Sequence, residues 1–323
     1  MKALAADLDE LCRRMRGEGR VALAVHEKPD SDALGAAAGM LDLFAQLGAE
    51  AELYVSEDEL LPLGDVLLPA GRVRRGAPPA DAALYALDSG SPDRLALPSW
   101  GDVAVNIDHH HDNPRYGELA FVRGDASSTS ELVCDIARAL GLRPSPEAAA
   151  ALYAGISFDT GHFHHDSTSP STFRTVAWLV ELGVDVTGMY ALLYESRSEA
   201  SLRLWARSVA GARSVAGGRA LLAAVTREDF SETGAGPEET DGIVDSLRGV
   251  DGVEVAALVK EQTGGAPVRV SLRSETIDVS AIAALQGGGG HKLASGFSSD
   301  DSTEEVIAWL SSELERRLST ASS

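Results

Sequence analysis

The sequence predicts an α/β protein with a parallel sheet in its N-terminal domain and a second, smaller α/β domain at its C-terminus. In the first half of the chain, short apolar runs alternate with amphipathic helical stretches, which is the pattern of βαβ units. A length of 323 residues exceeds what one ordinary hydrophobic core supports. A new set of apolar runs begins near Arg219, after a long helical stretch. We therefore expect domains at residues 1–186 and 215–323, joined by a helical segment over 187–214.

The N-terminal domain is predicted from strands that each lead into a loop or a helix. Gly48 is the expected stop of the first of these helices. Ser145 and Ser169 each precede a proline, and they predict two more helix starts because serine is a good N-cap and proline fits the first helical position. Strands are expected over residues 21–25, 51–55, 83–87 and 103–107, and helices over about 33–47, 146–156 and 170–182.

The rest of the chain is predicted as a helical connection followed by a second set of strands. The helical pattern extends from about Asp185 to Val215. Its expected buried positions are Leu192, Leu193, Leu202, Leu204 and Trp205. Segment 233–239, which contains two glycines and a proline, is expected to be a loop. Strands are expected over residues 219–225, 253–259 and 268–272.

The composition limits the class of protein. An apolar content of 44% and a charged content of 24% are those of a soluble globular protein. No segment approaches the roughly 20 consecutive apolar residues of a membrane helix, and the first 20 residues lack the apolar core of a signal peptide. Cys12 and Cys134 share no metal-type spacing, so a reduced, cytoplasmic protein is expected.

The net charge of −21 argues against a protein that coats duplex DNA. Such proteins need surplus lysine and arginine to displace counterions from phosphates. The same charge is compatible with a small phosphorylated substrate that is held by a metal and a few local cations. Much of the surplus acidity is expected to be solvated surface that maintains solubility.

Carboxylate and imidazole side chains follow three of the predicted strands. Because the carboxyl ends of neighbouring parallel strands line one crevice, these side chains are expected to converge on a shared metal centre. A lone aspartate after a strand is more often a turn residue or a helix N-cap, and this alternative stays open for each carboxylate taken alone. The converging set is His26, Asp30, Asp32, Asp88, His109 and Asp159.

The ligand types in this set restrict the metal. Oxygen and imidazole ligands without thiolate suit manganese or magnesium, and suit zinc or iron less specifically. Two ions about 3.5–4 Å apart could hold the attacking and leaving oxygens of a phosphoryl displacement. The residues therefore predict metal-assisted phosphoester chemistry.

Five motifs occur in the order that is found in a known family. They are His26-x-x-x-Asp30-x-Asp32, Leu87-Asp88-Ser89, Ile107-Asp108-His109-His110, Gly155-Ile-x-x-Asp159-Thr-Gly161 and Gly287-Gly-Gly-Gly290-His291-Lys-Leu-Ala-Ser-Gly296. With them the chain resembles the DHH phosphoesterases of the DHHA1 branch, and within that branch the short NrnA-like nanoRNase and pAp phosphatase subgroup. The resemblance covers nearly the whole chain. The sequence departs from the commonest family pattern at Ala36, Phe158 and Ser295, none of which is a ligand position.

The resemblance implies a centre of two Mn²⁺ ions, with Mg²⁺ as the alternative. Asp88 would bridge the two ions. One ion would be held by His26, Asp30 and Asp88, and the other by Asp32, Asp88, His109 and Asp159.

The resemblance also implies roles for the neighbouring residues. Asp108 would orient an adjacent imidazole and so fix its tautomer. His110 would face the substrate phosphate and donate a proton or a hydrogen bond. A water molecule between the ions is the implied nucleophile. We expect four histidines that follow these motifs to be solvated loop residues, with substrate contact left open for His164 or His165: His111, His162, His164 and His165.

The C-terminal domain is expected to hold the substrate. In the family, the loop that corresponds to residues 287–290 binds the distal nucleotide or its terminal phosphate, because glycine lets a ligand approach the backbone closely. Arg269 and Arg273 alternate along one predicted strand and therefore face the same side. Arginine recognises phosphate with two hydrogen bonds, although for Arg269 a plain surface role has equal weight. The expected substrate-binding residues are Arg273, Gly288, Gly289, Gly290 and His291.

The implied function is hydrolysis of short nucleotides (nanoRNA, pAp, pApA or cyclic di-AMP) to mononucleotides, and related proteins suggest a homodimer. A processive RecJ-like exonuclease is an alternative, but it usually needs extra domains and a basic channel. Family II pyrophosphatases share the metal centre but carry a different C-terminal motif. A non-catalytic nucleotide sensor is an alternative of another class, which a missing ligand would favour.

Overall fold

The structure is a computed structural model that describes residues 2–320 except 62, 98, 100, 196 and 263–266. The chain divides into two compact units, Met1–Glu195 and Ser196–Ser323, which are described separately. Each unit contains one sheet together with helices, so the predicted α/β fold class is confirmed. The predicted domain limits at residues 186 and 215 stay a prediction.

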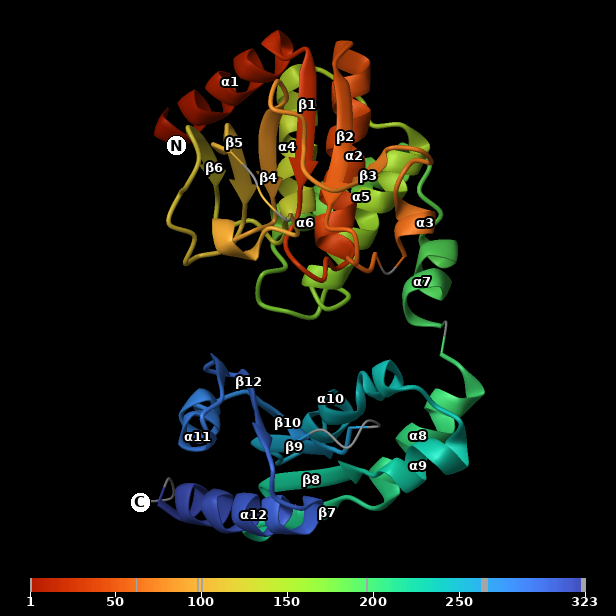
Figure 1. Ribbon diagram of the computed structural model, residues 1–323, viewed down its shortest axis with the longest axis vertical. Helices are drawn as coiled ribbons and strands as arrows, with labels where there is room; N and C mark the ends of the chain where they lie inside the picture. Colours follow the sequence, from red (N-terminus) through yellow and green to blue (C-terminus); the bar gives the residue numbers. More distant parts are fainter. Residues whose placement is uncertain are drawn as a thin grey trace. The chain divides into compact units, whose positions relative to one another are not determined.

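The first unit contains a parallel sheet in which the order of the strands reverses beside β1 (Figure 1). The described strands lie in the order β3-β2-β1-β4-β5-β6, and all neighbours are parallel. The chain runs outward from β1 to β3 and then returns to β4 on the other side of β1. Ligands bind beyond the carboxyl ends of the strands at such a reversal. The strands are β1 (Arg20–Ala24), β2 (Glu50–Val55), β3 (Val73–Arg75), β4 (Ala83–Leu87), β5 (Val105–Asp108) and β6 (Leu119–Val122).

Helices cover one face of this sheet with the main core of the unit, and Figure 1 shows α2, α4 and α5 behind the strands. The opposite face is covered by Leu95, Leu97, Val103 and Tyr116, which pack on the small strand residues. The helices are α1 (Lys2–Gly17), α2 (Ser31–Leu47), α3 (Gly64–Leu67), α4 (Thr129–Leu140), α5 (Pro146–Asp159), α6 (Pro170–Glu181) and α7 (Val186–Tyr194), with a 3-10 turn at Pro92–Arg94.

The second unit is a mixed sheet with a hydrophobic core on each face. The described strand order is β11-β12-β10-β9-β8-β7, in which only the β8–β9 pair is parallel. The strands are β7 (Arg213–Val215), β8 (Ala220–Val225), β9 (Val255–Lys260), β10 (Val268–Ser274), β11 (Gly289–His291) and β12 (Ala294–Ser299). The helices are α8 (Glu199–Ala210), α9 (Arg227–Thr233), α10 (Ile243–Arg248), α11 (Ser280–Ala283) and α12 (Thr303–Thr320), with 3-10 turns at Ala216–Gly218, Pro237–Thr240 and Ala284–Gln286.

Several predicted elements need correction. The expected helical run from Asp185 to Val215 is interrupted: α7 belongs to the first unit, α8 belongs to the second, and residues 213–215 form β7. Leu202 was expected to be buried, but its side chain is 54% exposed, because α8 buries Leu204 instead. The glycine run is only partly a loop, since residues 289–291 pair with β12 as strand β11.

The lengths and compositions of the helices bear on whether any of them could span a membrane. Among the described residues, no single helix is both long and apolar enough to cross a bilayer. Helices α6 and α7 meet the length and composition requirement only when taken together, as a pair bent by 112°.

Candidate metal centre

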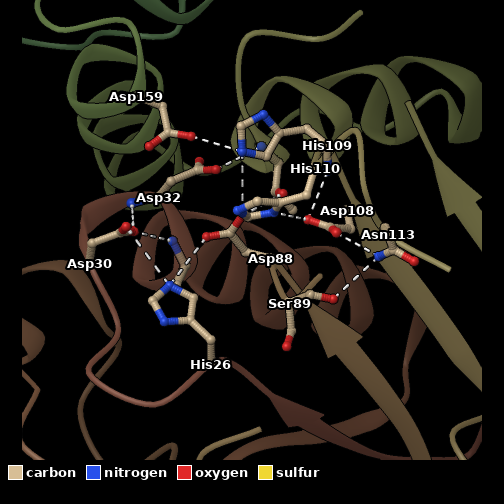
Figure 2. Close-up of polar contacts among 12 residues, drawn as sticks. His26, Asp30, Asp32, Asp88, Ser89, Asp108, His109, His110, Asn113 and Asp159 are labelled. Carbon is tan, nitrogen blue, oxygen red and sulfur yellow. Dashed lines mark hydrogen bonds and ion pairs between the residues drawn. The ribbon is translucent and has the colours of Figure 1, made fainter. Parts of the chain in front are cut away.

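Carboxylate and imidazole side chains from both halves of the sheet point toward one another at its carboxyl edge (Figure 2). His26 follows β1, Asp88 follows β4 and His109 follows β5, and because these three strands are neighbours, their carboxyl ends bring the side chains together. The donor atoms form three groups within which all atoms lie within 4.8 Å of one another. These groups are His26, Asp30 and Asp88; Asp32, His109 and Asp159; and Asp88, His109 and His110.

The first group is oriented by backbone hydrogen bonds. The Nδ1 atom of His26 lies 2.8 Å from the carbonyl oxygen of Glu27, and because a carbonyl only accepts, Nδ1 carries the proton. This leaves Nε2, which lies 3.8 Å from Asp30 Oδ2 and 3.6 Å from Asp88 Oδ2, as a possible ligand atom. Asp30 also caps α2, because its Oδ1 accepts from the amides of Asp32 and Ala33. The capping interpretation is confirmed for Oδ1, and Oδ2 stays available for the predicted ligand role.

The second group combines three elements of the first unit. His109 Nε2 lies 2.9 Å from Asp159 Oδ2 at the end of α5. Asp32, in the first turn of α2, is fully buried, and its two oxygens accept from the amides of Thr129 and Ser130 at 2.7 and 2.9 Å. Gly155 makes room for this carboxylate, because a Cβ there would lie 2.7 Å from Asp32 Oδ1. The close packing against Asp32 therefore explains why the Gly-Ile-x-x-Asp motif has glycine at this position.

Asp88 lies between these two groups. Its Oδ2 faces His26, while its Oδ1 lies 3.6 Å from His109 Nε2. The backbone of Asp88 is left-handed, with φ of 54°, a conformation that costs roughly 1–3 kcal/mol in a residue other than glycine. Next to it, the carbonyl of Ser89 accepts from Tyr116 Oη at 2.9 Å and from Asn113 Nδ2 at 3.3 Å. These bonds hold a strained turn that presents one carboxylate oxygen to each group.

Asp108 orients the neighbouring His110. Its Oδ1 accepts from His110 Nδ1 at 2.7 Å and from the amide of His109 at 2.9 Å. Its Oδ2 accepts from Asn113 Nδ2 at 2.5 Å. Because Nδ1 of His110 is engaged with Asp108, this ring has only Nε2 left for another partner, and its side chain is 35% exposed. His110 is therefore oriented by Asp108, although its Nδ1 also lies 4.0 Å from Asp88 Oδ1.

The charges of the centre fit divalent cations. Burial raises the pKa of Asp32 well above its usual range, and two neighbouring carboxylates raise it further. Burial alone lowers the pKa of His26, but the carboxylates of Asp30 and Asp88 raise it to about 10. Burial likewise lowers the pKa of His109, while three surrounding carboxylates raise it to about 10. Without cations the centre retains protons to balance its carboxylates, and oxygen and imidazole ligands without thiolate suit hard divalent ions.

Both units of the chain are similar to known protein domains. Residues 20–156 match the DHH family, N-terminal domain, and residues 217–320 match the DHHA1 domain. A Thermus thermophilus protein named bifunctional oligoribonuclease and PAP phosphatase NrnA is 31% identical over 306 residues, which cover 93% of this chain and 91% of that protein. The chain belongs to the DHH family. The predicted resemblance is thereby confirmed.

A second relative supports the DHH assignment, and a solved structure shows the same fold. A Streptococcus mutans protein named probable bifunctional oligoribonuclease and PAP phosphatase NrnA is 31% identical over 280 residues, which cover 85% of this chain and 87% of that protein. The crystal structure of an exopolyphosphatase-related protein from Bacteroides fragilis has a TM-score of 0.82, with 22% identity over 98% of both chains. That structure shows that the DHH and DHHA1 units share its fold.

Sequence analysis missed two residues of the DHH centre, Thr129 and Asn113. The hydroxyl of Thr129 donates to Asp88 Oδ1 at 2.9 Å, and Asn113 bonds to Asp108. The available signal was the run of hydroxyl residues 127–130 that precedes Glu131, which marks a capped helix start. That signal does not show that the helix start faces Asp32, which lies 97 residues earlier in the chain.

The predicted substrate-binding residues lie in the DHHA1 unit. Arg273 of β10 pairs with Ala294 of β12, which pairs with His291 of β11. Directly opposed residues of neighbouring strands point to the same face, so Arg273 and His291 share one face of the sheet, together with Arg269 four residues earlier on β10. The guanidinium of Arg273 lies 3.5 Å from Asp245 Oδ1 and donates to the carbonyl of Leu272.

The four histidines that were expected to be solvated, His111, His162, His164 and His165, are all exposed. One of them has aromatic neighbours: the ring of His162 lies 4.9 and 5.1 Å from the rings of Tyr190 and Tyr194.

We expect the metal-free DHH protein to lose stability as the pH rises from 6.5 to about 10. The folded-state pKa values of His26 and His109 lie above the unfolded value, so their stabilising contribution is complete below pH 6.5 and is lost as the pH rises through about 10. Thermal unfolding with a chelator at both pH values tests this.

The double variant His26→Asn, His109→Asn controls for general repulsion at high pH, and its stability should depend less on pH than that of the parent. Added metal should weaken or reverse the trend, because metal ligands bind in their deprotonated form. A chelated parent protein whose pH dependence matches that of the double variant contradicts the expectation.

Proposed function

We propose that this protein is a Mn²⁺-dependent phosphoesterase that hydrolyses short nucleotides (nanoRNA, pAp, pApA or cyclic di-AMP) to mononucleotides. The observation that carries the proposal is Asp88, which directs one oxygen toward His26 and the other toward His109. Such a carboxylate suits two ions held side by side, and paired ions are typical of enzymes that displace a phosphoryl group. Mg²⁺ is the alternative metal, and the cytoplasm is the expected compartment.

The residues of the centre would divide the chemistry between them. One ion would be held by His26, Asp30 and Asp88, and the other by Asp32, Asp88, His109 and Asp159. When bound, two divalent cations would lower the pKa of a water molecule and neutralise charge that develops on the phosphoryl oxygens.

His110 is the proposed proton donor. In the hydrolysis, a water oxygen forms a bond to phosphorus, the bond from phosphorus to the leaving oxygen breaks, and that oxygen needs a proton or a hydrogen bond. The hydrogen bond to Asp108 raises the pKa of His110, which favours the protonated ring. Because Nδ1 is engaged with Asp108, His110 would donate through Nε2.

The substrate class rests on the DHHA1 unit and on the relatives. The relatives from Thermus thermophilus and Streptococcus mutans are named for oligoribonuclease and PAP phosphatase activity. Arg273 and His291 offer charge-assisted hydrogen bonds to a phosphate on one face of the second sheet. A short nucleotide with a terminal phosphate suits a few such donors, whereas a long strand needs an extended basic channel.

Gly288, Gly289 and Gly290 differ in whether the fold itself requires glycine at that position. A Cβ at Gly288 would lie 2.2 Å from the carbonyl oxygen of Gly296 and 2.4 Å from Phe297 Cβ. Gly290 has a φ of 135°, which residues with side chains rarely adopt. A Cβ at Gly289 would have no described atom within 4 Å, and its φ is not positive. Gly289 is therefore the one of the three whose missing side chain suits the approach of a ligand rather than the fold.

We expect Gly289→Ala to fold normally and to raise the KM for a short nucleotide by about tenfold, because an added methyl group would displace a hydrogen-bonded substrate phosphate. Steady-state kinetics with pApA and thermal unfolding measure the two effects. Gly288→Ala is the matched variant, and it should lower the unfolding temperature because its Cβ meets backbone. Unchanged kinetics in folded Gly289→Ala would remove this glycine from the substrate site.

Two other functions use the same ligands. A RecJ-like exonuclease would degrade long single strands, and a nucleotide sensor would bind without turnover. Every ligand that the family motif requires is present in this chain, which favours catalysis over sensing. A homodimer remains our expectation for the assembly.

Product analysis tests the proposal. Purified protein with Mn²⁺ is incubated with pAp, pApA, cyclic di-AMP, a longer RNA and pyrophosphate, and Asp88→Ala is the control. Release of AMP from the short nucleotides by the parent protein alone is the expected result. Turnover of pyrophosphate alone or of long strands alone contradicts the substrate assignment, and tight nucleotide binding with no product after long incubation supports the sensor.

A further inference from the structure

The first turn of α4 contacts both ligand groups of the centre. The amide of Thr129 donates to Asp32 Oδ2 at 2.7 Å, and its side-chain hydroxyl donates to Asp88 Oδ1 at 2.9 Å. Thr129 is fully buried, so water cannot replace its hydroxyl without rearrangement of the turn. Because the amide is fixed on one carboxylate, the hydroxyl is held in place against the other.

This contact is asymmetric with respect to the two groups. Oδ1 of Asp88 is the oxygen on the side of His109, at 3.6 Å from Nε2, whereas Oδ2 is on the side of His26. The hydroxyl of Thr129 donates to Oδ1. Loss of the hydroxyl would therefore leave the buried oxygen beside His109 without its neutral donor.

We propose that Thr129 is a positioning residue that makes the two metal positions unequal, because it fixes the Asp88 oxygen that serves the Asp32–His109–Asp159 position. The inference rests on the proposed two-ion function and adds a residue to it. The His26–Asp30 position does not depend on this hydroxyl, because it uses the other oxygen of Asp88.

Metal titration tests the inference without substrate. Chelator-treated full-length protein is titrated with MnCl₂ by calorimetry. Thr129→Val removes the donor at nearly constant shape, and it should weaken one of the two binding steps by roughly 10- to 100-fold, the usual cost of losing a partner of a metal ligand. The other step should stay within about twofold. Thr129→Ser keeps the hydroxyl and should restore both steps.

The same turn provides a matched control. Ser127 is buried, and its hydroxyl donates to Glu131 Oε2 at 2.5 Å, so Ser127→Ala also removes a bond to a buried carboxylate, but one outside the ligand groups. Both binding steps should persist in Ser127→Ala. Asp30→Asn identifies the steps, because it should weaken the step that Thr129→Val leaves unchanged. If Thr129→Val does not fold, Thr129→Ala replaces it.

Three outcomes overturn the inference: unchanged titrations in Thr129→Val, equal weakening of both steps, or the same loss in Ser127→Ala. The result is separable from the proposed function. A protein with the predicted titrations that releases no mononucleotide upholds the role of Thr129 and rejects the activity. An active enzyme whose metal-binding steps are unchanged in Thr129→Val upholds the proposed function and rejects the role of Thr129.

Discussion

Asp88→Asn is expected to lower kcat on a short nucleotide by at least about a thousandfold. The substitution keeps the size of the side chain but removes the negative charge that lies 3.6 Å from both His26 Nε2 and His109 Nε2. Metal ions supply several kcal/mol of transition-state stabilisation in phosphoryl transfer, and about 1.4 kcal/mol corresponds to a factor of ten in rate. Loss of the shared ligand should disturb both metal positions at once. Steady-state kinetics at saturating Mn²⁺ measure the effect.

Stability separates this loss of activity from a loss of folding. Asparagine can still accept from the hydroxyl of Thr129, and the centre would contain one buried negative charge fewer. Metal-free Asp88→Asn should therefore unfold within a few degrees of the metal-free parent. Activity near that of the parent in this variant would exclude Asp88 as a shared ligand, whichever metal is bound.

His110→Asn is expected to lower kcat by about 10²- to 10⁴-fold while both metal-binding steps persist, since this is the usual contribution of a positioned acid or base. The ring is held by Asp108 at 2.7 Å and its side chain is 35% exposed, whereas that of His26, a proposed ligand, is 9% exposed. The loss should be greatest for a substrate whose leaving oxygen needs a proton. Kinetics with pApA and Mn²⁺ titration of the same sample provide the two readouts.

The neighbouring His111 gives a matched control for this prediction. It is exposed and follows His110 directly in the chain. His111→Asn should keep kcat within about threefold of the parent, as most exposed substitutions away from a site do. Equal losses in the two variants would show that the His110 effect comes from the loop rather than from a proton donor. A weakened metal step in His110→Asn would instead make His110 a ligand.

Much of the DHH centre could be predicted from sequence because of a general property of parallel sheets. Predicted strands ended just before His26, Asp88 and His109, and the carboxyl ends of such strands meet at one edge. The chemistry of the side chains then restricted the metal. Predictions were less accurate where several structures fit one pattern: the helical rhythm of residues 185–215 did not reveal its two breaks, and the exposed Leu202 had the same apolar character as the buried Leu204.

The sequence by itself determined the fold class and the family, and it predicted the candidate ligands, because these depend on periodicity and on motifs that are local in the chain. The tertiary structure alone decided which oxygen of Asp88 faces which imidazole, and that Asp30 caps α2 with one oxygen while it keeps the other for the centre. It also revealed Thr129, whose hydroxyl meets a carboxylate 41 residues away. Such pairings follow from the packing of α4 against the sheet, and hydrogen bonds between distant segments leave no periodic signal in sequence.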